Sequence, residues 1–364
     1  KKTERDMKDL IPHGAKWVKD YVEDVDPEKN TITTRASGAI SYDYLVACPG
    51  IQIDLDGIEG LKETMGKNNV CSNYVDPDYT WEVLQKFKGG NALFTQPATP
   101  IKCGGAPQKI MYLAEDYFRK SGVKDKTNII FATPGSVIFA TEPFKTTLMQ
   151  VVDRKDIQLR FFHKLTRIDG VNKKAYYTIM QSADEPEKIL YNAKECGIKK
   201  LTDTEIEIPF EMLHLAPPQS APDFIKKSKI AFQDGPNKGW INVNINTLQS
   251  PEYPNVFALG DAAALPTAKT GAAIRKQAPV LVHNLMQVIK HQVPVDQYHG
   301  YSSCPIVTGY GKMLLAEFDY TNERDSDPLL SKFFDTSKEL YSMWILKKYG
   351  LPFMYWNMML KGKA

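Results

Sequence analysis

Residues 253–273 read YPNVFALGDAAALPTAKTGAA and form the strongest structural signal in the chain. The apolar run 255–259 predicts a short buried strand that places Asp261 at its carboxyl end, the edge where open α/β sheets bind ligands. Gly260 lets a ligand approach the backbone, and the Asp261 carboxylate can accept a hydrogen bond from a sugar or ribityl hydroxyl. A helix predicted over about 271–291 directs the positive end of its dipole at the same crevice. The pattern therefore favours flavin binding over an ordinary Gly-Asp turn.

The composition is that of a globular protein. The chain has 364 residues, of which 43% are hydrophobic and 24% charged, with 23 Gly, 23 Pro and five Cys. These values exclude a disordered, collagen-like or disulfide-stapled chain, and the length predicts two domains or one large domain with a tail. The net charge of +3 is too balanced to indicate a nucleic-acid partner. No apolar run reaches the roughly 20 residues that a membrane-spanning helix needs.

A strand–helix–strand unit lies in the first half of the chain. Strand 91–95 is followed by a loop over 96–107, a helix over 108–121 and a strand over 127–132, and a further helix is predicted over 77–87. Strands that alternate with helices at this spacing predict a parallel α/β sheet.

More strands are predicted on either side of this unit. Residues 16–25, 31–34 and 41–50 contain strand patterns, the last ending at a Pro-Gly break. Residues 159–215 are also rich in strand patterns, and the polar stretch 184–204 within them predicts a loop or insertion.

Cys103 lies in the loop QPATPIKCGGAP at residues 96–107, just ahead of a predicted helix and close to Lys102 and Lys109. A helix N-terminus and nearby lysines both favour the thiolate, the form of cysteine that acts as nucleophile and redox partner. A lone cysteine in a Gly-rich loop is more often idle. This context instead predicts that Cys103 is redox-active.

Cys304 lies in YSSCPIVTGY at residues 301–310, which predicts a loop over a pocket because a proline follows the cysteine. The other cysteines lack such a setting: Cys48 is predicted to be a buried strand thiol near the cofactor, Cys71 has no distinctive surroundings, and Cys196 falls in the polar insertion. The six histidines show no metal-ligand spacing, so no metal site is predicted.

Taken together, these segments resemble the mitochondrial type of sulfide:quinone oxidoreductase, within the FAD-dependent pyridine nucleotide–disulfide oxidoreductases. The similarity includes the two cysteine segments, DYLVACPG at residues 43–50, the stretch 253–273 and the closing PFMYWNMML at residues 352–360. It implies an α/β fold with tandem Rossmann-like dinucleotide-binding domains, like glutathione reductase, and a C-terminal helical tail that associates with a membrane. The implied domains are 1–75 (the remainder of the FAD-binding domain), 76–215 (the inserted second Rossmann-like domain), 216–300 (a return to the FAD-binding domain) and 301–364 (the C-terminal region).

The resemblance also implies the site residues. FAD would be held by Val22, Gly50, Gly260, Asp261, Lys269, Thr270, Gly271 and Ala272. Cys103 and Cys304 would be bridged in the oxidised state, and hydrogen sulfide would attack Cys304 to give a persulfide there and a thiolate at Cys103. Two electrons would then pass through the flavin to a ubiquinone-type quinone, and sulfite or glutathione would accept the sulfur. Lys109 and Lys347 occupy basic positions of the family near the active site.

The tail, residues 337–360, is rich in aromatic and apolar residues with lysines among and beside them. Such a stretch predicts helices lying in the membrane interface, where a lipid-soluble quinone could enter, although the same helices could instead cap the protein's own core. The resemblance implies a peripheral location at the mitochondrial inner membrane.

Two alternatives stay open at this point. A type II NADH:quinone dehydrogenase shares the implied fold, but it requires a glycine fingerprint where Cys103 stands. A catalytically inactive remnant is the other alternative, because the first G-x-G-x-x-G of the family, with its acidic partner for the ribose, is not found in the chain. In the family that element precedes the segment with which this chain opens, so the chain is expected to be N-terminally incomplete.

Overall fold

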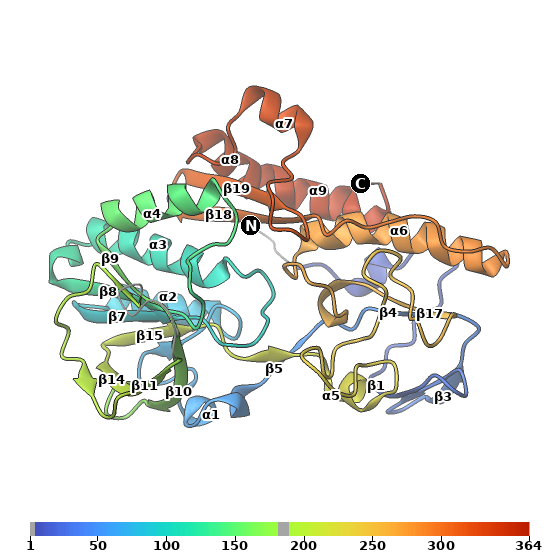
Figure 1. Ribbon diagram of the computed structural model, residues 1–364, viewed down its shortest axis with the longest axis horizontal. Helices are drawn as coiled ribbons and strands as arrows, with labels where there is room; N and C mark the ends of the chain where they lie inside the picture. Colours follow the sequence, from blue (N-terminus) through green and yellow to red (C-terminus); the bar gives the residue numbers. More distant parts are fainter. Residues whose placement is uncertain (1–3, 181–188, 364) are drawn as a thin grey trace. The chain divides into compact units, whose positions relative to one another are not determined.

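The computed structural model describes residues 4–180 and 189–363, which form two compact units (Figure 1). Unit 1 consists of Lys1–Ile51, Ala221–Ser302 and Ser342–Ala364, and unit 2 of Gln52–Ser220 and Ser303–Tyr341. The chain therefore passes from one unit to the other four times.

Unit 2 is built on a sheet whose strands run in the order β12-β9-β8-β7-β15-β6 across the described residues. The neighbours from β9 to β6 are parallel, and β12 pairs antiparallel with β9. The strands are β6 (Val70–Cys71), β7 (Gly90–Thr95), β8 (Thr127–Ala132), β9 (Ile157–Arg160), β12 (Leu190–Tyr191) and β15 (Met212–Leu215). The predicted parallel α/β sheet is thus confirmed.

Two layers cover this sheet. On one side lie α2 (Pro77–Lys86), α3 (Ala106–Lys120) and α4 (Phe144–Arg154) (Figure 1). On the other side lies an antiparallel sheet of β10 (His163–Asp169), β11 (Lys174–Ile179), β14 (Glu205–Pro209) and β13 (Lys199–Lys200). Alternate residues of β7 and β8 point into the two layers, and Leu93 and Ile130 pack with Ile208 in the core between the sheets. Burial on both faces explains why these strands are almost wholly apolar.

The predicted strand–helix–strand unit corresponds to β7, α3 and β8, with ends that differ by no more than two residues from the predictions. Helix α2 also begins where expected, because Asp76 caps it by accepting a hydrogen bond from the Tyr79 backbone N–H and Pro77 occupies its first turn.

Three smaller elements complete the first part of unit 2. They are β5 (Gln52–Ile53), which pairs with β16 (Gln219–Ser220), and the short helix α1 (Leu61–Thr64). The predicted polar insertion 184–204 contains β12 and β13, and its first residues, 184–188, lie outside the described residues.

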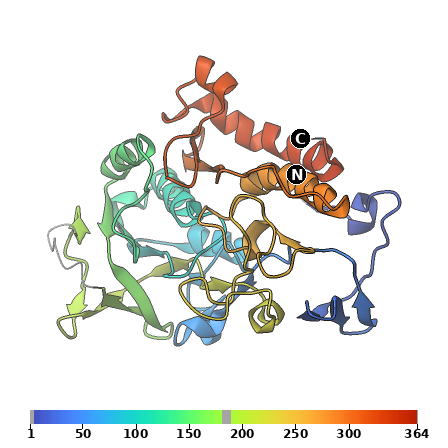
Figure 2. The same cartoon turned by 45° about the vertical axis from the view of Figure 1, so that its right-hand side comes forward.

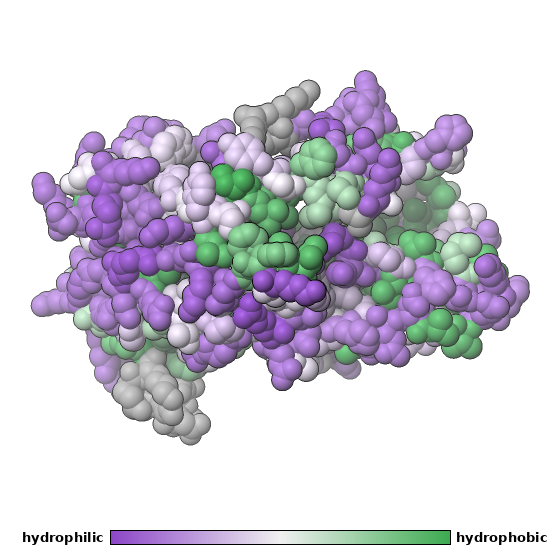
Figure 3. Space-filling model, turned by 90° about the horizontal axis from the view of Figure 1, so that it is seen from above, coloured by the Kyte–Doolittle hydropathy of each residue, from purple (hydrophilic) through white to green (hydrophobic). Residues whose placement is uncertain are grey.

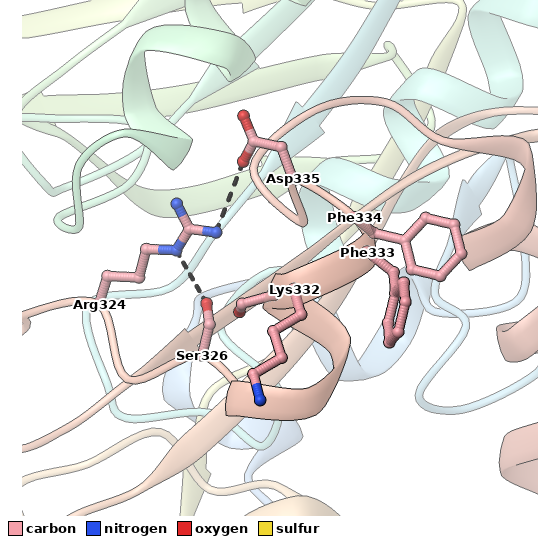
Figure 4. Close-up of a pocket in the computed structure, with 7 residues that line it drawn as sticks. Arg324, Ser326, Lys332, Phe333, Phe334 and Asp335 are labelled. Atoms are coloured by element: carbon pink, nitrogen blue, oxygen red, sulfur yellow. Dashed lines mark hydrogen bonds and ion pairs between the residues drawn. The ribbon is translucent and has the colours of Figure 1, made fainter.

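The last part of unit 2 is a pair of strands, β18 (Ser302–Gly309) and β19 (Lys312–Phe318), followed by α7 (Pro328–Phe333). An open cavity of about 610 Å³ lies beside α7 and is lined by Arg324, Ser326, Ser331, Lys332, Phe333, Phe334 and Asp335 (Figure 4). The Arg324 side chain donates to Ser326 Oγ at 2.8 Å and pairs with Asp335 at 3.5 Å. No cysteine lines this cavity.

Unit 1 contains an antiparallel sheet of β1 (Val22–Asp26), β2 (Thr31–Thr34) and β3 (Gly38–Ser41), coloured blue in Figure 2. The predicted strand 16–25 was too long, because only its last four residues belong to β1. Trp17, Val18 and Tyr21 are exposed, so the alternation of apolar residues before Val22 does not mark a buried face. The predicted strand 41–50 is also interrupted, since β3 ends at Ser41 and β4 begins at Leu45.

In unit 1 the strand and the helix predicted from residues 253–273 are both present. Strand β17 (Val256–Ala258) pairs in parallel with β4 (Leu45–Ala47), and α6 (Gly271–Ile289) begins at the expected residue. A short helix, α5 (Asp223–Lys227), precedes them. The tail forms α8 (Tyr341–Ile345), the π-helical turn η6 (Leu346–Gly350) and α9 (Leu351–Asn357). In the part of the chain that the structure describes, no helix is both long and apolar enough to cross a bilayer.

Candidate functional site

Cys103 follows β7 and stands three residues before α3. Its φ of +57° lies in the left-handed region, which costs an L-residue other than glycine about 1–2 kcal/mol. The carbonyl of Cys103 accepts a hydrogen bond from the Ala106 N–H at 2.7 Å, where α3 begins. The backbone thus turns sharply at the cysteine and continues directly into a helix.

Lys109, one turn into α3, donates from Nζ to the sulfur of Cys103 at 2.8 Å. An ammonium group at this distance stabilises negative charge on sulfur, and the N-terminus of the 15-residue helix adds to the effect. Of the two lysines named by the resemblance, Lys109 therefore contacts a predicted catalytic cysteine. The other, Lys347, lies in η6 of unit 1.

The fold places Cys304 next to the sulfur of Cys103. It lies on β18, is 1% exposed, and shares a hydrogen bond with the sulfur of Cys103. The Cys103 sulfur, followed by burial, raises the pKa of Cys304 well above its ordinary value, whereas the Lys109 charge and the Gly105 N–H act in the opposite direction. The surroundings thus favour the protonated form of Cys304, next to a Cys103 sulfur that Lys109 also contacts.

The expected loop at Cys304 is wrong, because the residue sits within a strand of eight residues and is not exposed. Proline has no backbone N–H to donate to a neighbouring strand. In a two-stranded sheet each strand has a neighbour on one edge only, so Pro305 can lie in β18 without ending it.

The other cysteines have different surroundings from this pair. Cys48 was expected to be a buried strand thiol, but it follows the end of β4 and is exposed. Cys71 is fully buried in β6, and burial raises its pKa to about 12. Cys196 is buried and its sulfur contacts the side-chain amide of Gln158. The raised pKa keeps Cys71 in the thiol form, which is the unreactive form of cysteine.

The predicted flavin residues other than Val22 gather at one edge of unit 1. Because β4 and β17 are parallel, their carboxyl ends place Gly50 and the Gly260–Asp261 turn at the same edge. Gly260 has φ +74°, which a residue with a side chain rarely adopts, and its N–H donates to the Gln277 side chain on α6 at 2.9 Å. Val22 is not part of this pair of strands, since it opens β1 in the separate antiparallel sheet.

Lys269 fixes the turn that presents Asp261. Its Nζ donates to the carbonyl oxygens of Asp261 and Ala263 at 2.6 and 3.1 Å, and it lies 4.1 Å from the centre of the Trp240 ring. Burial lowers the pKa of Lys269 to about 8, although the Asp261 carboxylate opposes the shift. The lysine therefore braces the backbone around Asp261.

The N-terminus of α6 is open to a ligand. Thr270 caps it by accepting from the Ala273 N–H at 3.1 Å, and Gly271 and Ala272 occupy the first turn. A Cβ built on Gly271 would meet no atom within 4 Å. First-turn N–H groups of a helix lack intrahelical acceptors and bind anionic or polar groups. The first turn of α6, the left-handed glycine and the carboxylate have the chemistry that the polar groups of a flavin dinucleotide require.

Sequence reasoning missed two side chains next to Cys103. Tyr74 donates from Oη to the Lys102 carbonyl at 2.7 Å, and the Gln219 side-chain oxygen accepts from the Lys102 N–H at 2.9 Å. They lie 28 and 117 residues from Lys102, and neither belongs to a local motif. Only the folded chain brings them to the cysteine loop.

Comparison with curated proteins finds three close relatives named mitochondrial sulfide:quinone oxidoreductase. The Mus musculus protein is 42% identical over 355 residues, covering 97% of this chain and 73% of the relative. The Dictyostelium discoideum protein is 42% identical over 369 residues, with coverage of 100% and 75%. The Schizosaccharomyces pombe protein is 36% identical over 367 residues, with coverage of 98% and 74%. No family model matches the chain.

Solved structures share the fold at lower identity. A chain of the Tetrahymena thermophila mitochondrial ATP synthase aligns with a TM-score of 0.75 at 19% identity, covering 96% of this chain and 80% of that one. The sulfide:quinone oxidoreductase of Aquifex aeolicus aligns with a TM-score of 0.65 at 20% identity, with coverage of 83% and 67%. The second of these supports the predicted Rossmann-type fold. On the strength of the three relatives at 36–42% identity over nearly its full length, this chain belongs to the mitochondrial sulfide:quinone oxidoreductase family.

Proposed function

We propose that this chain is an FAD-dependent enzyme that oxidises hydrogen sulfide and passes the two electrons to a quinone. The observation on which the proposal rests is that the Cys103 sulfur contacts both the Cys304 thiol and the Lys109 ammonium. Its relatives are named for this activity, which supports the assignment.

The first chemical step follows from the unequal surroundings of the two sulfurs. In the oxidised chain a disulfide joins Cys103 and Cys304, and hydrosulfide attacks the Cys304 sulfur. A new S–S bond forms at Cys304, the old one breaks, and Cys103 leaves as a thiolate. Lys109 favours this direction, because a leaving thiolate that contacts an ammonium departs more readily than one that is buried without such a cation.

The cycle closes in two further steps. Sulfite or glutathione takes the outer sulfur of the persulfide and leaves a reduced Cys304. The dithiol pair then loses two electrons and two protons and is bridged again, while the quinone gains two of each. FAD, when bound, relays the two electrons from the sulfurs to the quinone.

The flavin is proposed to bind at Val22, Gly50, Gly260, Asp261, Lys269, Thr270, Gly271 and Ala272. Asp261 would accept a hydrogen bond from a ribityl hydroxyl, and the first turn of α6 would donate to the polar groups of the cofactor. Lys269 would hold the Asp261 turn in place through its two backbone contacts.

Replacing either catalytic cysteine tests this function. Cys304→Ser and Cys103→Ser should each abolish sulfide-dependent reduction of a soluble ubiquinone analogue, because neither variant can form the bridge that sulfide opens. Cys48→Ser is the matched control, since Cys48 is exposed and lies in the other unit. The assay measures quinol formation with sulfide and sulfite, and in parallel with NADH. Turnover retained in Cys304→Ser contradicts the proposal, and quinone reduction by NADH alone favours a type II NADH dehydrogenase.

We further propose that the tail attaches the enzyme to the mitochondrial inner membrane, where its quinone dissolves. Within the unit 1 tail, exposed apolar and aromatic side chains include Ile345, Tyr349, Phe353, Tyr355 and Met358. Lysines 347, 348, 361 and 363 accompany them. Figure 3 looks down on the face that includes α9 and shows green apolar residues among purple polar ones. This mixture is typical of interfacial helices.

A further inference from the structure

Cys103 adopts an uncommon backbone conformation that other groups must maintain. Its φ of +57° is left-handed, and the peptide groups on both sides of it are held by hydrogen bonds. After Cys103, its carbonyl accepts from the Ala106 N–H. Before Cys103, the Lys102 carbonyl accepts from Tyr74 Oη at 2.7 Å. The orientation of the peptide that precedes the cysteine is therefore set by a tyrosine side chain.

Gln219 holds the other side of Lys102. Its Oε1 accepts from the Lys102 N–H at 2.9 Å, and the residue is 1% exposed. Gln219 is itself fixed, because its N–H donates to Thr99 Oγ1 at 3.0 Å and it pairs with Ile53 between β16 and β5. Lys102 thus has both backbone polar groups bound to side chains that come from distant parts of unit 2.

Tyr74 also lies beside the two sulfurs. Burial, followed by the charges of Cys103 and Cys304, raises the pKa of Tyr74. Its hydroxyl therefore stays protonated and keeps donating to the Lys102 carbonyl when a thiolate forms next to it. The contact persists in both charge states of the pair.

We propose that Tyr74 and Gln219 are positioning residues that hold Cys103 left-handed, so that its sulfur meets Cys304 and Lys109. This inference rests on the proposed function, for which the two sulfurs must bond. Without the two contacts the peptide before Cys103 is free to rotate, and φ returns to the negative values that L-residues prefer. The Cα–Cβ bond then points elsewhere, and the sulfur loses contact with Cys304.

The experiment measures the equilibrium constant for forming the Cys103–Cys304 disulfide in glutathione redox buffers. The remaining thiols are alkylated, and the peptides that contain the two cysteines are quantified by mass spectrometry. Tyr74→Phe removes only the hydroxyl, and Gln219→Met removes the acceptor at nearly constant size. Each should lower the equilibrium constant for disulfide formation about tenfold, because each variant loses one hydrogen bond that favours the bridged geometry, and tenfold corresponds to about 1.4 kcal/mol. The full chain is used throughout.

Tyr79→Phe is the matched control, because Tyr79 Oη also contacts a backbone group, the Asn69 N–H at 3.3 Å, just before β6 and not in the Cys103 loop. If the Tyr74 hydroxyl had only a structural role, Tyr74→Phe and Tyr79→Phe would both lower the stability of the fold. Neither variant would then change the equilibrium constant for disulfide formation. The inference is overturned if Tyr74→Phe and Gln219→Met leave the equilibrium constant within twofold of wild type, or if Tyr79→Phe lowers it equally. Failure of the wild-type pair to form any disulfide would instead contradict the proposed function.

Discussion

Cys103 and Cys304 have the same side chain but opposite tasks, and their neighbours account for the difference. Lys109 lies against one sulfur, whereas Cys304 is buried and has a raised pKa. The left-handed turn at Cys103 costs about 1–2 kcal/mol, and the hydrogen bonds that hold it contribute about 0.5–1.5 kcal/mol each. The turn is thus stabilised locally, without a large demand on the rest of the fold.

Asp261 allows a test of the flavin site at the level of one residue. Asp261→Ala removes the acceptor proposed for the ribityl chain, and a hydrogen bond to a charged group is worth about 1.5–3 kcal/mol. We expect the dissociation constant for FAD to rise about tenfold or more. Flavin absorbance of the purified protein, followed by titration with FAD, measures the change. Asp234→Ala is the control, since Asp234 is exposed in the same unit. Equal flavin affinity in the Asp261 variant and the control would contradict the assignment.

Among the site residues, the sequence allowed the prediction of those that belong to continuous motifs. Asp261 follows an apolar strand and precedes a helix, so its place was predictable from neighbours within the same stretch. Tyr74 and Gln219 were not predictable, because what they do depends on a contact across 28 and 117 residues. Cys48 was misplaced for a related reason: its apolar neighbours indicate a buried strand, but β4 ends one residue earlier and leaves the thiol exposed.

At the level of elements, β7, α3 and β8 were predicted almost to the residue. The central residues of both strands are apolar because both faces of each strand are buried, and the loop between β7 and α3 contains prolines and glycines that end regular structure. The alternation before Val22 failed as a guide because side chains such as Trp17 and Tyr21 face solvent. β18 was missed because a proline after the cysteine and nearby glycines resemble a loop when the pairing with β19 is not known.

The C-terminal helices allow a test of membrane binding. Ile345, Tyr349 and Phe353 recur every fourth residue, which places them along one side of a helix. Burying a phenylalanine side chain is worth about 1.5–3 kcal/mol, so Phe353→Asp should weaken binding to phospholipid vesicles about tenfold or more. Co-sedimentation with vesicles that contain anionic lipid measures this change.

Val171→Asp is the control for that experiment, because Val171 is 82% exposed in the turn between β10 and β11. It introduces the same charge on an apolar surface residue in unit 2. The membrane proposal predicts that this variant still sediments with the vesicles. If both variants bind as wild type does, the tail helices cover the protein rather than a bilayer.

At the level of the whole molecule, two buried histidines predict how stability changes with pH. Burial lowers the pKa of His163 to about 4 and that of His214 to about 3, from an ordinary value of 6.5. Below pH 6.5 the unfolded chain therefore binds protons that the folded chain does not, and the free energy of unfolding falls as the solution is acidified towards pH 4. Each histidine contributes a slope of about 1.4 kcal/mol per pH unit in that range.

Urea unfolding of the full chain at pH 7, 6 and 5 measures this slope. His163→Asn should remove about half of the histidine contribution, while its amide can still donate to the Phe161 carbonyl that His163 Nδ1 now contacts at 2.6 Å. His13→Asn, at an exposed histidine, is the matched control. Parallel pH profiles for wild type and His163→Asn would show that His163 titrates in the folded chain as it does in the unfolded one.

The division of the chain into two units also separates two groups of proposed functional residues. Both cysteines, Lys109, Tyr74 and Gln219 belong to unit 2, whereas the residues proposed to hold the flavin belong to unit 1. Lys109, which contacts the Cys103 sulfur, and the two side chains that hold Lys102 thus come from the same unit as the sulfur pair. The acidity of the sulfur pair and the affinity for the cofactor are therefore proposed to depend on different stretches of the chain.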